Sequence, residues 1–202
     1  KLSGTTTITK VGEPLNSYYG YHVTGFFQNE EEVENSAQPS AEPGFPHFED
    51  LNRDGKISAD DRKIIGNQFP DFTYGFRNVI SYKNWTLDFF IQGEQGADML
   101  NLYMIQSMFP ASMYRNRYAP IVTDQWTPDN KDANWPTAVN PYRYEYGKVN
   151  DLVIKDASYM RLQNIELSYQ FSDLESSILQ SARIYVKGQN IFTITDYPGF
   201  NP

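Results

Sequence analysis

Residues 71–94 read DFTYGFRNVISYKNWTLDFFIQGE, and this segment contains two alternating patterns. In each half, aromatic and aliphatic residues share one parity and polar residues share the other. Side chains in a β-strand point to opposite faces with a period of two, so each half predicts an amphipathic strand. The apolar positions are Phe72, Tyr74, Phe76, Ile80 and Tyr82 in the first half and Trp85, Leu87, Phe89 and Ile91 in the second.

Lys83-Asn84 is the turn material between the two halves. A two-residue hairpin loop there would set Tyr82 opposite Trp85, Ile80 opposite Leu87, and Phe76 opposite Ile91. The apolar faces of both strands then lie on the same side of the hairpin. This agreement between pattern and turn supports the predicted pairing.

The apolar face of the hairpin admits two interpretations. Strands of roughly ten residues, with an apolar outside, a polar inside and aromatic ends, are typical of outer-membrane barrels. In that case, Tyr82 and Trp85 lie in the interfacial aromatic belt beside a short periplasmic turn. The alternative is a soluble β-sandwich with this face in its core. Alternation alone does not separate the two, because its signal per segment is weak.

Composition narrows the class of protein. The chain has 202 residues, of which 21% are charged and 40% hydrophobic, so it is not a disordered chain. Fifteen Tyr and thirteen Phe suit a β-rich protein, and the absence of Cys fits either redox compartment. A net charge of -8 argues against nucleic-acid binding. No apolar run is long enough for a membrane helix, and we expect the chain to be a piece of a longer protein.

Further elements are expected along the chain. Segments 5–11 and 18–28 read as extended, 30–35 as a short acidic helix, and 98–109 as a helix because Met99, Leu102, Ile105 and Met108 have helical spacing. Segments 165–171 and 183–194 alternate and predict two more strands. Met160 and Leu162 have the opposite parity to Ile165, so a β-bulge is expected near Gln163-Asn164.

Residues 50–61, DLNRDGKISADD, match the calcium loop D-x-[DN]-x-[DN]-G. Calcium takes six to eight oxygen ligands, which alternate positions of a tight loop bring to one centre. The predicted ligands are the side chains of Asp50, Asn52 and Asp54, the carbonyl of Lys56, Ser58 directly or through water, and Asp61. Asp61 replaces the usual Glu, as in the dockerin variant of this EF-hand-like loop. We expect a calcium site, with a Kd of roughly 10⁻⁴ to 10⁻³ M if it is structural, and the alternative is an Asp/Asn/Gly-rich turn that binds no ion.

The sequence shows no catalytic motif, and we predict that the protein is not an enzyme. His22 and His47 have no evident partners, and no nucleophile elbow, zinc spacing or phosphate loop occurs. Aromatic residues in the irregular part of the chain could stack on sugar rings or could anchor a long loop. They are Trp126, Trp135, Tyr142, Tyr144 and Tyr146.

Five ordered motifs resemble the C-terminal portion of a SusC/RagA-type TonB-dependent outer-membrane receptor. The first three are Gly20-Tyr21 with Gly25-Phe26-Phe27-Gln28, then Asp50–Arg62 with Ile64-Ile65-Gly66-Asn67, then PDFTYG at 70–75 with SYKN at 81–84. The last two are SYMRL at 158–162 and GQNIF at 188–192. Arg53 departs from the family, which usually has Gly in this position of the calcium loop. The TonB box, the plug and the last strand of the family lie outside this sequence.

This resemblance implies an all-β fold of antiparallel strands that form part of a large outer-membrane β-barrel, of roughly 22 strands around a plug. Residues 1–70 would hold extended segments and an extracellular loop with the calcium motif. Residues 71–202 would hold barrel-wall strands and a long extracellular loop at 95–156. The implied location is the Gram-negative outer membrane, in contact with lipid. The implied function is nutrient uptake, by import of oligosaccharides (glycan import) or peptides. The implied partners are a SusD-like surface lipoprotein and a TonB complex bound through the missing N-terminal region.

A second function fits the same features. A secreted, calcium-dependent, carbohydrate-binding β-sandwich module would also show alternation, a calcium loop and loop aromatics. Solubility separates the two, because a module is monomeric in buffer whereas a fragment of a barrel wall aggregates or requires detergent.

Overall fold

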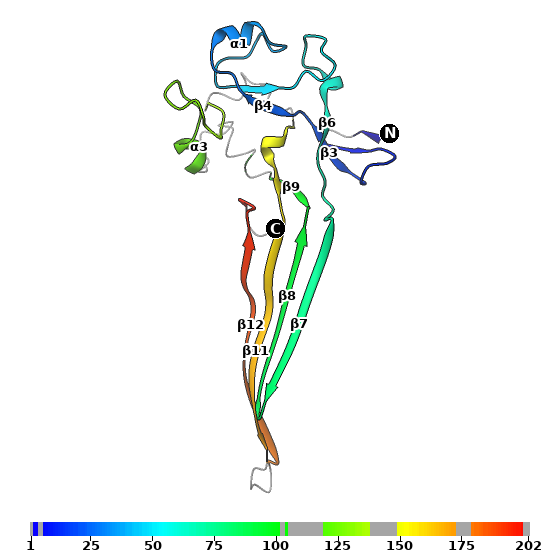
Figure 1. Cartoon of the computed structure of the whole chain (residues 1–202), viewed down its shortest axis with the longest axis vertical. Coiled ribbons are helices and arrows are strands. Elements are labelled where there is room, and N and C mark those ends of the chain that lie inside the picture. The colour runs from blue at the N-terminus through cyan, green and yellow to red at the C-terminus, as the bar shows by residue number, and fades with distance from the viewer. Residues whose placement is uncertain are drawn as a thin grey trace. The chain divides into compact units, whose positions relative to one another are not determined.

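The structure is a computed structural model that describes residues 2–3, 6–101, 104, 119–137, 149–172 and 179–199. Short strands occupy the first third of the chain, and the long strands β7, β8, β11 and β12 follow, with the short strands β9 and β10 between β8 and β11 (Figure 1). The strands are β1 Leu2–Ser3, β2 Thr7–Thr9, β3 Ser17–Gly20, β4 Val23–Phe26, β5 Pro46–Phe48, β6 Lys63–Gly66, β7 Phe72–Tyr82, β8 Trp85–Gln95, β9 Asp98–Leu100, β10 Ile154–Asp156, β11 Tyr159–Ser172 and β12 Ser181–Thr195. The helices are α1 Glu30–Glu34, η1 Ala59–Asp61, α3 Ala119–Thr123 and η3 Asp151–Val153. No described helix has the length and apolarity needed to cross a bilayer.

Contacts divide the chain into two units. The first combines residues 1–68 with 98–155, and the second combines 69–97 with 156–202. The boundary expected at residue 70 lies beside the first division point. Most of the segment expected as one long loop, 95–156, belongs to the first unit.

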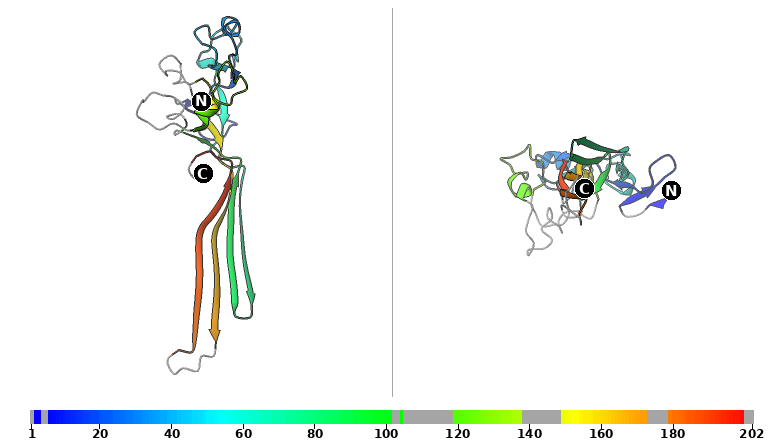
Figure 2. Two further views of the ribbon diagram at one scale, coloured as in Figure 1. Left: turned by 90° about the vertical axis from the view of Figure 1, so that its left-hand side faces the viewer. Right: turned by 90° about the horizontal axis from the view of Figure 1, so that it is seen from below.

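The second unit is one antiparallel sheet of four strands in the order β12-β11-β8-β7 (Figure 1). The hairpin β7–β8 has the predicted register, with Tyr82 opposite Trp85, Ile80 opposite Leu87, and Phe76 opposite Ile91. Lys83 in the turn has a φ of 53°. Figure 2 shows β11 and β12 continuing past the end of this hairpin. The sequence pattern therefore predicted the central pairing correctly.

The predicted β-bulge is present in β11. Pairing with both neighbouring strands shifts between Leu162 and Asn164, which leaves Gln163 unpaired. The bulge restores the apolar parity, because Leu162 opposes Ile91 and Ile165 opposes Phe89 on the same face. One extra residue thus lets β11 follow the apolar face of β8 along its whole length.

The first unit contains small sheets and a compact apolar cluster. One sheet has the order β1-β2-β3-β6, and further pairs are β4-β5 and β9-β10. Phe27, Val33 and Phe45 are buried together, with Ala41 packed against them. Val33 comes from α1, the short acidic helix that the sequence predicted. Asn29 caps this helix by accepting the Glu32 amide at 2.9 Å.

Two expectations for the first unit need correction. Segment 18–28 is two strands rather than one, because β3 pairs with β6 whereas β4 pairs with β5. Residues 98–100 form a strand and not the start of a helix. Residues 98–100 pair with β10, and the Asn101 amide donates a hydrogen bond to the Val153 carbonyl at 2.8 Å. These interactions stabilise a strand, although the apolar residues of this segment have helical spacing. The rest of the expected helix, apart from Asn101 and Met104, lies outside the described residues.

Candidate functional site: the two faces of the four-stranded sheet

The apolar face of the four-stranded sheet is exposed within the described residues. Val186 is 78% exposed, and Ile80 on the far strand is 53% exposed. The registers align apolar residues across all four strands, as in the row Ile80, Leu87, Leu167 and Val186. Other exposed large residues on this face are Phe76, Tyr82, Trp85, Phe171, Ile184, Phe192 and Ile194. Soluble monomers rarely expose a contiguous apolar surface of this kind, so it marks an interaction with another apolar phase.

Aromatic side chains gather on this face at the hairpin-turn end of the sheet. Trp85 contacts Tyr169 edge to face at a centroid distance of 4.9 Å, and Tyr169 contacts Phe171 at 4.7 Å. The Lys83 amine lies 5.5 Å from the centre of the Tyr82 ring. Trp and Tyr rings beside a lysine are typical of the protein surface that lies at a membrane–water interface.

Aromatic rings from the neighbouring strand pack over two glycines of the hairpin. The Tyr74 ring covers Gly93 on the apolar face, where a Cβ would also meet the Tyr159 carbonyl oxygen. On the polar face, the Phe90 ring lies over Gly75, with its nearest atoms 3.1 and 3.3 Å from the position of an added Cβ. Rings packed over glycines fix the strand register. This packing gives the Tyr74-Gly75 part of the PDFTYG motif a structural role.

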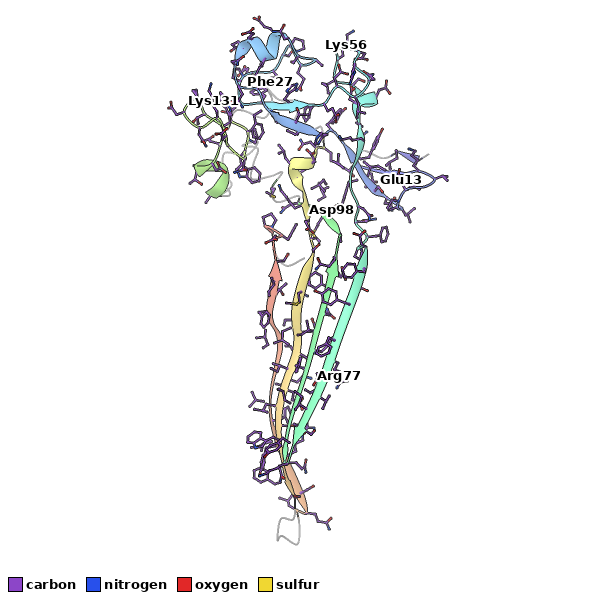
Figure 3. All side chains as sticks on the ribbon, in the orientation of Figure 1. Glu13, Phe27, Lys56, Arg77, Asp98 and Lys131 are labelled. Atoms are coloured by element: carbon purple, nitrogen blue, oxygen red, sulfur yellow. The ribbon has the colours of Figure 1, made fainter. Side chains whose placement is uncertain are left out.

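The polar face carries a row of charges that crosses all four strands. Arg77 on β7 donates two hydrogen bonds to Asp88 on β8, at 3.1 and 2.7 Å. Arg183 on β12 donates to Glu166 on β11. Asp88 and Glu166 are direct cross-strand neighbours, an arrangement of like charges that would be unfavourable without the two arginines. Arg77 and the other side chains of this sheet are drawn in Figure 3.

A groove of about 400 Å³ lies on this polar face. Its lining combines charged groups with one aromatic ring and one amide, on all four strands. The lining residues are Arg77, Asp88, Phe90, Asn164, Glu166 and Lys187. Asn164 follows the bulge residue Gln163 and lies opposite Phe90, so the bulge places the amide beside the ring.

The calcium-like loop is held by hydrogen bonds from its own backbone. Asp50 accepts the amides of Asp54 (3.3 Å) and Gly55 (2.9 Å), Asn52 accepts that of Asp54 (2.9 Å), and Asp54 accepts that of Lys56 (2.9 Å). The oxygens at positions 1, 3 and 5 therefore face one short piece of backbone. Among the described residues, no group of three or more acidic or histidine side chains is gathered closely enough to hold a metal ion.

Asp61 and Ser58 close the calcium-like loop. Asp61 is fully buried, and its two oxygens accept the amides of Leu51 (3.0 Å), Asn52 (3.5 Å) and Ser58 (2.7 Å). Burial raises the pKa of this carboxyl, but the donated hydrogen bonds outweigh burial and lower its pKa overall. The stability that the ionised carboxylate contributes is present at neutral pH and is lost as the pH falls through the lowered pKa.

Arg53 and Lys56 extend from the loop into solvent. Arg53 has a φ of 59°, in the left-handed region that favours glycine. A glycine at this position would adopt the same conformation without steric cost from a Cβ. Figure 3 labels Lys56 in the same loop.

His22 has a partner that sequence reasoning missed. Its Nδ1 bonds the Asp151 carboxylate, whose other oxygen accepts the Val23 amide at 3.0 Å. The two residues are 129 positions apart, so no local pattern could reveal the pair. Together with the Tyr21 amide, which donates to the Val149 carbonyl at 2.9 Å, the pair fastens residues 149–151 to residues 21–23.

The loop aromatics that the structure describes are anchors. Trp126 and Trp135 are buried, and the Trp126 indole donates to the Gln28 side chain at 3.1 Å. These two rings are therefore not available to stack on sugars. Tyr142, Tyr144 and Tyr146 lie outside the described residues.

Comparison with known proteins identifies the relatives of this chain. It is 37% identical to TonB-dependent receptor P3 of Formosa agariphila over the whole chain, and 30% identical to receptor P26 of the same organism over 99% of the chain. It is 27% identical to TonB-dependent receptor SusC of Bacteroides thetaiotaomicron over 96% of the chain. The chain spans about a fifth of the length of these curated relatives. No protein-family model matches the chain.

Solved structures share the fold. The RagAB peptide transporter matches 99% of the chain with a TM-score of 0.76 and 24% identity, and the chain covers 21% of that structure's chain. The same importer in its "closed-closed" state matches with a TM-score of 0.73.

An antiparallel sheet with one exposed apolar face and one charged face is consistent with a segment of a β-barrel wall. Together with the sequence matches, which cover nearly all of this chain, this structure identifies the chain as a C-terminal portion of a TonB-dependent receptor of the SusC/RagA type. The five sequence motifs predicted this assignment. The relatives are named as receptors and transporters, in agreement with the prediction of a non-enzymatic protein.

Proposed function

We propose that the chain forms part of the wall of an outer-membrane transporter that imports nutrients. The exposed apolar face of the four-stranded sheet carries this proposal. That face borders lipid, and the charged face borders the aqueous interior of the barrel. Strands β7 and β12 each pair with one neighbour among the described residues, so their outer edges must be completed by other strands of the same barrel.

The dimensions of the apolar face suit a bilayer. Apolar residues run from Phe72 to Tyr82 on β7, ten steps that span roughly 33 Å along the strand. A strand tilt of about 40° reduces this length to about 25 Å along the membrane normal, the height of the apolar band of outer-membrane barrels. The aromatic group of Trp85, Tyr169 and Phe171 then lies at one interface.

The secreted sandwich module is the weaker proposal. It requires a second sheet over the apolar face, but Ile80 and Val186 on opposite sides of that face are both more than half exposed. The relatives are receptors and not secreted modules.

The substrate and partners are proposed from the relatives. SusC and the RagAB peptide transporter support a polar nutrient, either an oligosaccharide or a peptide, taken up with a SusD-like surface lipoprotein. Energy would come from a TonB complex that contacts another part of the receptor. The location would be the outer membrane of a Gram-negative cell.

The orientation can be tested by labelling, because the chain contains no cysteine. Arg53→Cys and Lys83→Cys introduce thiols at exposed positions, in the calcium-like loop and in the hairpin turn. In intact cells that express the receptor in a cysteine-free background, a membrane-impermeant maleimide should label Arg53→Cys. It should label Lys83→Cys only after the outer membrane is permeabilised. Labelling of both in a protein released to the medium would instead support the secreted module.

We also propose that the loop at 50–61 binds calcium weakly, through Asp50, Asn52, Asp54 and the Lys56 carbonyl, with Ser58 and Asp61 closing it. The spacing of its residues supports this proposal, whereas the hydrogen bonds of Asp61 hold the loop without an ion. In calcium titrations of the intact receptor, Asp54→Asn should weaken a millimolar site with little effect in chelator. Asp61→Asn should destabilise the loop in chelator as well, by about 2 kcal/mol, because buried amides lose a charged acceptor. If the thermal stability of the receptor is identical with calcium and with chelator, the proposal that this loop binds calcium is wrong.

A further inference from the structure

The apolar face of the four-stranded sheet ends in a row of side chains that crosses all four strands. Tyr82 lies opposite Trp85, Trp85 opposite Tyr169, and Tyr169 opposite Ile184. This is the last row before the turn of the β7–β8 hairpin. Tyr82 and Ile184, at the two edges of the row, are 68% and 61% exposed. The row is therefore open to a molecule that approaches this end of the apolar face.

Lys83 places a positive charge beside this row. Its amine lies over the Tyr82 ring, 5.5 Å from the ring centre, so the charge is held on the apolar side of the sheet. Lys83 is exposed, and among the residues that the structure describes its amine has no hydrogen bond and no ion pair. An anion from outside this part of the chain can therefore approach Lys83 without displacing a protein partner.

The polar face carries a similar combination of groups, but there the charge is neutralised. The Arg183 guanidinium lies 5.8 Å from the centre of the Tyr185 ring. Arg183 also pairs with the Glu166 carboxylate. The cation beside a tyrosine on the polar face thus has its counter-ion within the sheet, whereas Lys83 has none within the described parts of the chain.

The aromatic row also carries hydrogen-bond donors. The Trp85 indole N–H and the hydroxyls of Tyr82 and Tyr169 make no hydrogen bond to any described residue. Together with the Lys83 amine, these groups offer one positive charge and three donors at the border of an apolar surface. A phospholipid has matching features, because its phosphate is a charged acceptor and its acyl chains are apolar.

We propose that Lys83, Tyr82, Trp85 and Tyr169 form a binding site for the phosphate group of an anionic glycerophospholipid, whose acyl chains lie along the apolar face. This inference rests on the proposed transport function, because the apolar face meets acyl chains only if the sheet is part of a barrel wall. In the proposed orientation the hairpin turn faces the periplasm, so the lipid belongs to the inner leaflet of the outer membrane. The charge of Lys83 selects a headgroup of net negative charge over a zwitterionic one.

Native mass spectrometry of the intact, detergent-solubilised receptor tests the proposal. The probes are palmitoyl-oleoyl phosphatidylglycerol and palmitoyl-oleoyl phosphatidylcholine, which have the same acyl chains and differ in headgroup charge. Lys83→Gln should weaken binding of the first phosphatidylglycerol roughly fivefold, because it removes one charge at the membrane surface. The same variant should bind phosphatidylcholine within about twofold of the unmodified receptor. Lys83→Arg keeps the charge and should retain the affinity for phosphatidylglycerol.

Matched variants on the two faces separate the site from general effects on the sheet. Tyr82→Phe removes one hydroxyl donor and should weaken phosphatidylglycerol binding roughly threefold. Its control is Tyr185→Phe on the polar face, and the control for Lys83→Gln is Lys187→Gln, also on the polar face. Both controls should change the Kd less than about twofold, because lipid does not reach that face.

Three results would overturn the lipid site. They are equal affinity of the receptor and its Lys83→Gln variant for phosphatidylglycerol, an equal loss of affinity in Lys187→Gln, and displacement of phosphatidylglycerol by inorganic phosphate, which would indicate a site for a free anion. Heat-modifiable gel migration of each variant shows whether the barrel is folded. A folded, membrane-inserted receptor whose affinity for phosphatidylglycerol does not depend on Lys83 would refute this inference alone, whereas failure to insert into membranes would refute the transport proposal itself.

Discussion

Ile80→Arg is expected to destabilise the membrane-inserted receptor by about 2 kcal/mol, whereas Val79→Arg should change its stability by less than about 1 kcal/mol. The two residues are adjacent, β-branched and equally exposed, at 53% and 55%. They differ in the face they occupy. Ile80 lies in the apolar row opposite Leu87, and Val79 lies opposite Asp88 beside the charged groups. An arginine is costly in hydrocarbon but finds a carboxylate and water on the polar face.

The measurement is urea unfolding in lipid vesicles, together with the amount of heat-modifiable receptor in the outer membrane. Leu167→Arg, farther along the apolar row, should behave like Ile80→Arg. Equal effects at positions 79 and 80 would mean that the two faces meet the same medium. Such a result would remove the physical basis of the transporter assignment.

Gly93→Ala is expected to cost about 2–3 kcal/mol, the second large effect. An added Cβ at position 93 would meet the Tyr74 ring and the carbonyl oxygen of Tyr159. The carbonyl belongs to the backbone of the neighbouring strand and cannot move without disturbing the β8–β11 pairing. The apolar face would therefore lose its register at the point where Tyr74 covers the sheet.

Gly75→Ala is the matched control, on the same hairpin but the opposite face. Its Cβ would meet the edge of the Phe90 ring at 3.1 and 3.3 Å, and a side-chain ring can shift by a few tenths of an ångström. We expect a change within about 1 kcal/mol in the same unfolding assay. A loss at position 75 as large as that at position 93 would contradict the assignment of Tyr159 as the rigid neighbour.

The sequence was sufficient for the strands of the central hairpin and their register. The hairpin pairs, the β-bulge at Gln163 and the acidic helix α1 all follow from local parity, turn residues or capping. These features depend on neighbours within a few residues, and such neighbours are visible in a linear pattern. The five motifs likewise identified the family, because the order of motifs can be read from the sequence without any knowledge of contacts.

Local pattern failed where a partner distant in the chain decides the conformation. Residues 98–100 have helical spacing but become a strand because β10, more than fifty residues away, provides the pairing. His22 appeared isolated until the fold brought Asp151 to it. The sequence left open whether Trp126 and Trp135 stack on sugars or anchor a loop. Both side chains are buried, so they act as anchors.

The alternation of residues 71–94 alone determined that these strands have one apolar and one polar face, because side-chain direction follows from backbone geometry. It left undetermined whether the apolar face was covered. Exposure is a property of the assembled sheet, so the uncovered apolar row, the paired charges and the groove beside Phe90 came from tertiary structure. The neighbours that join the two halves of this sheet, such as Phe90–Asn164 and Asp88–Glu166 on β8 and β11, are more than seventy residues apart in the chain.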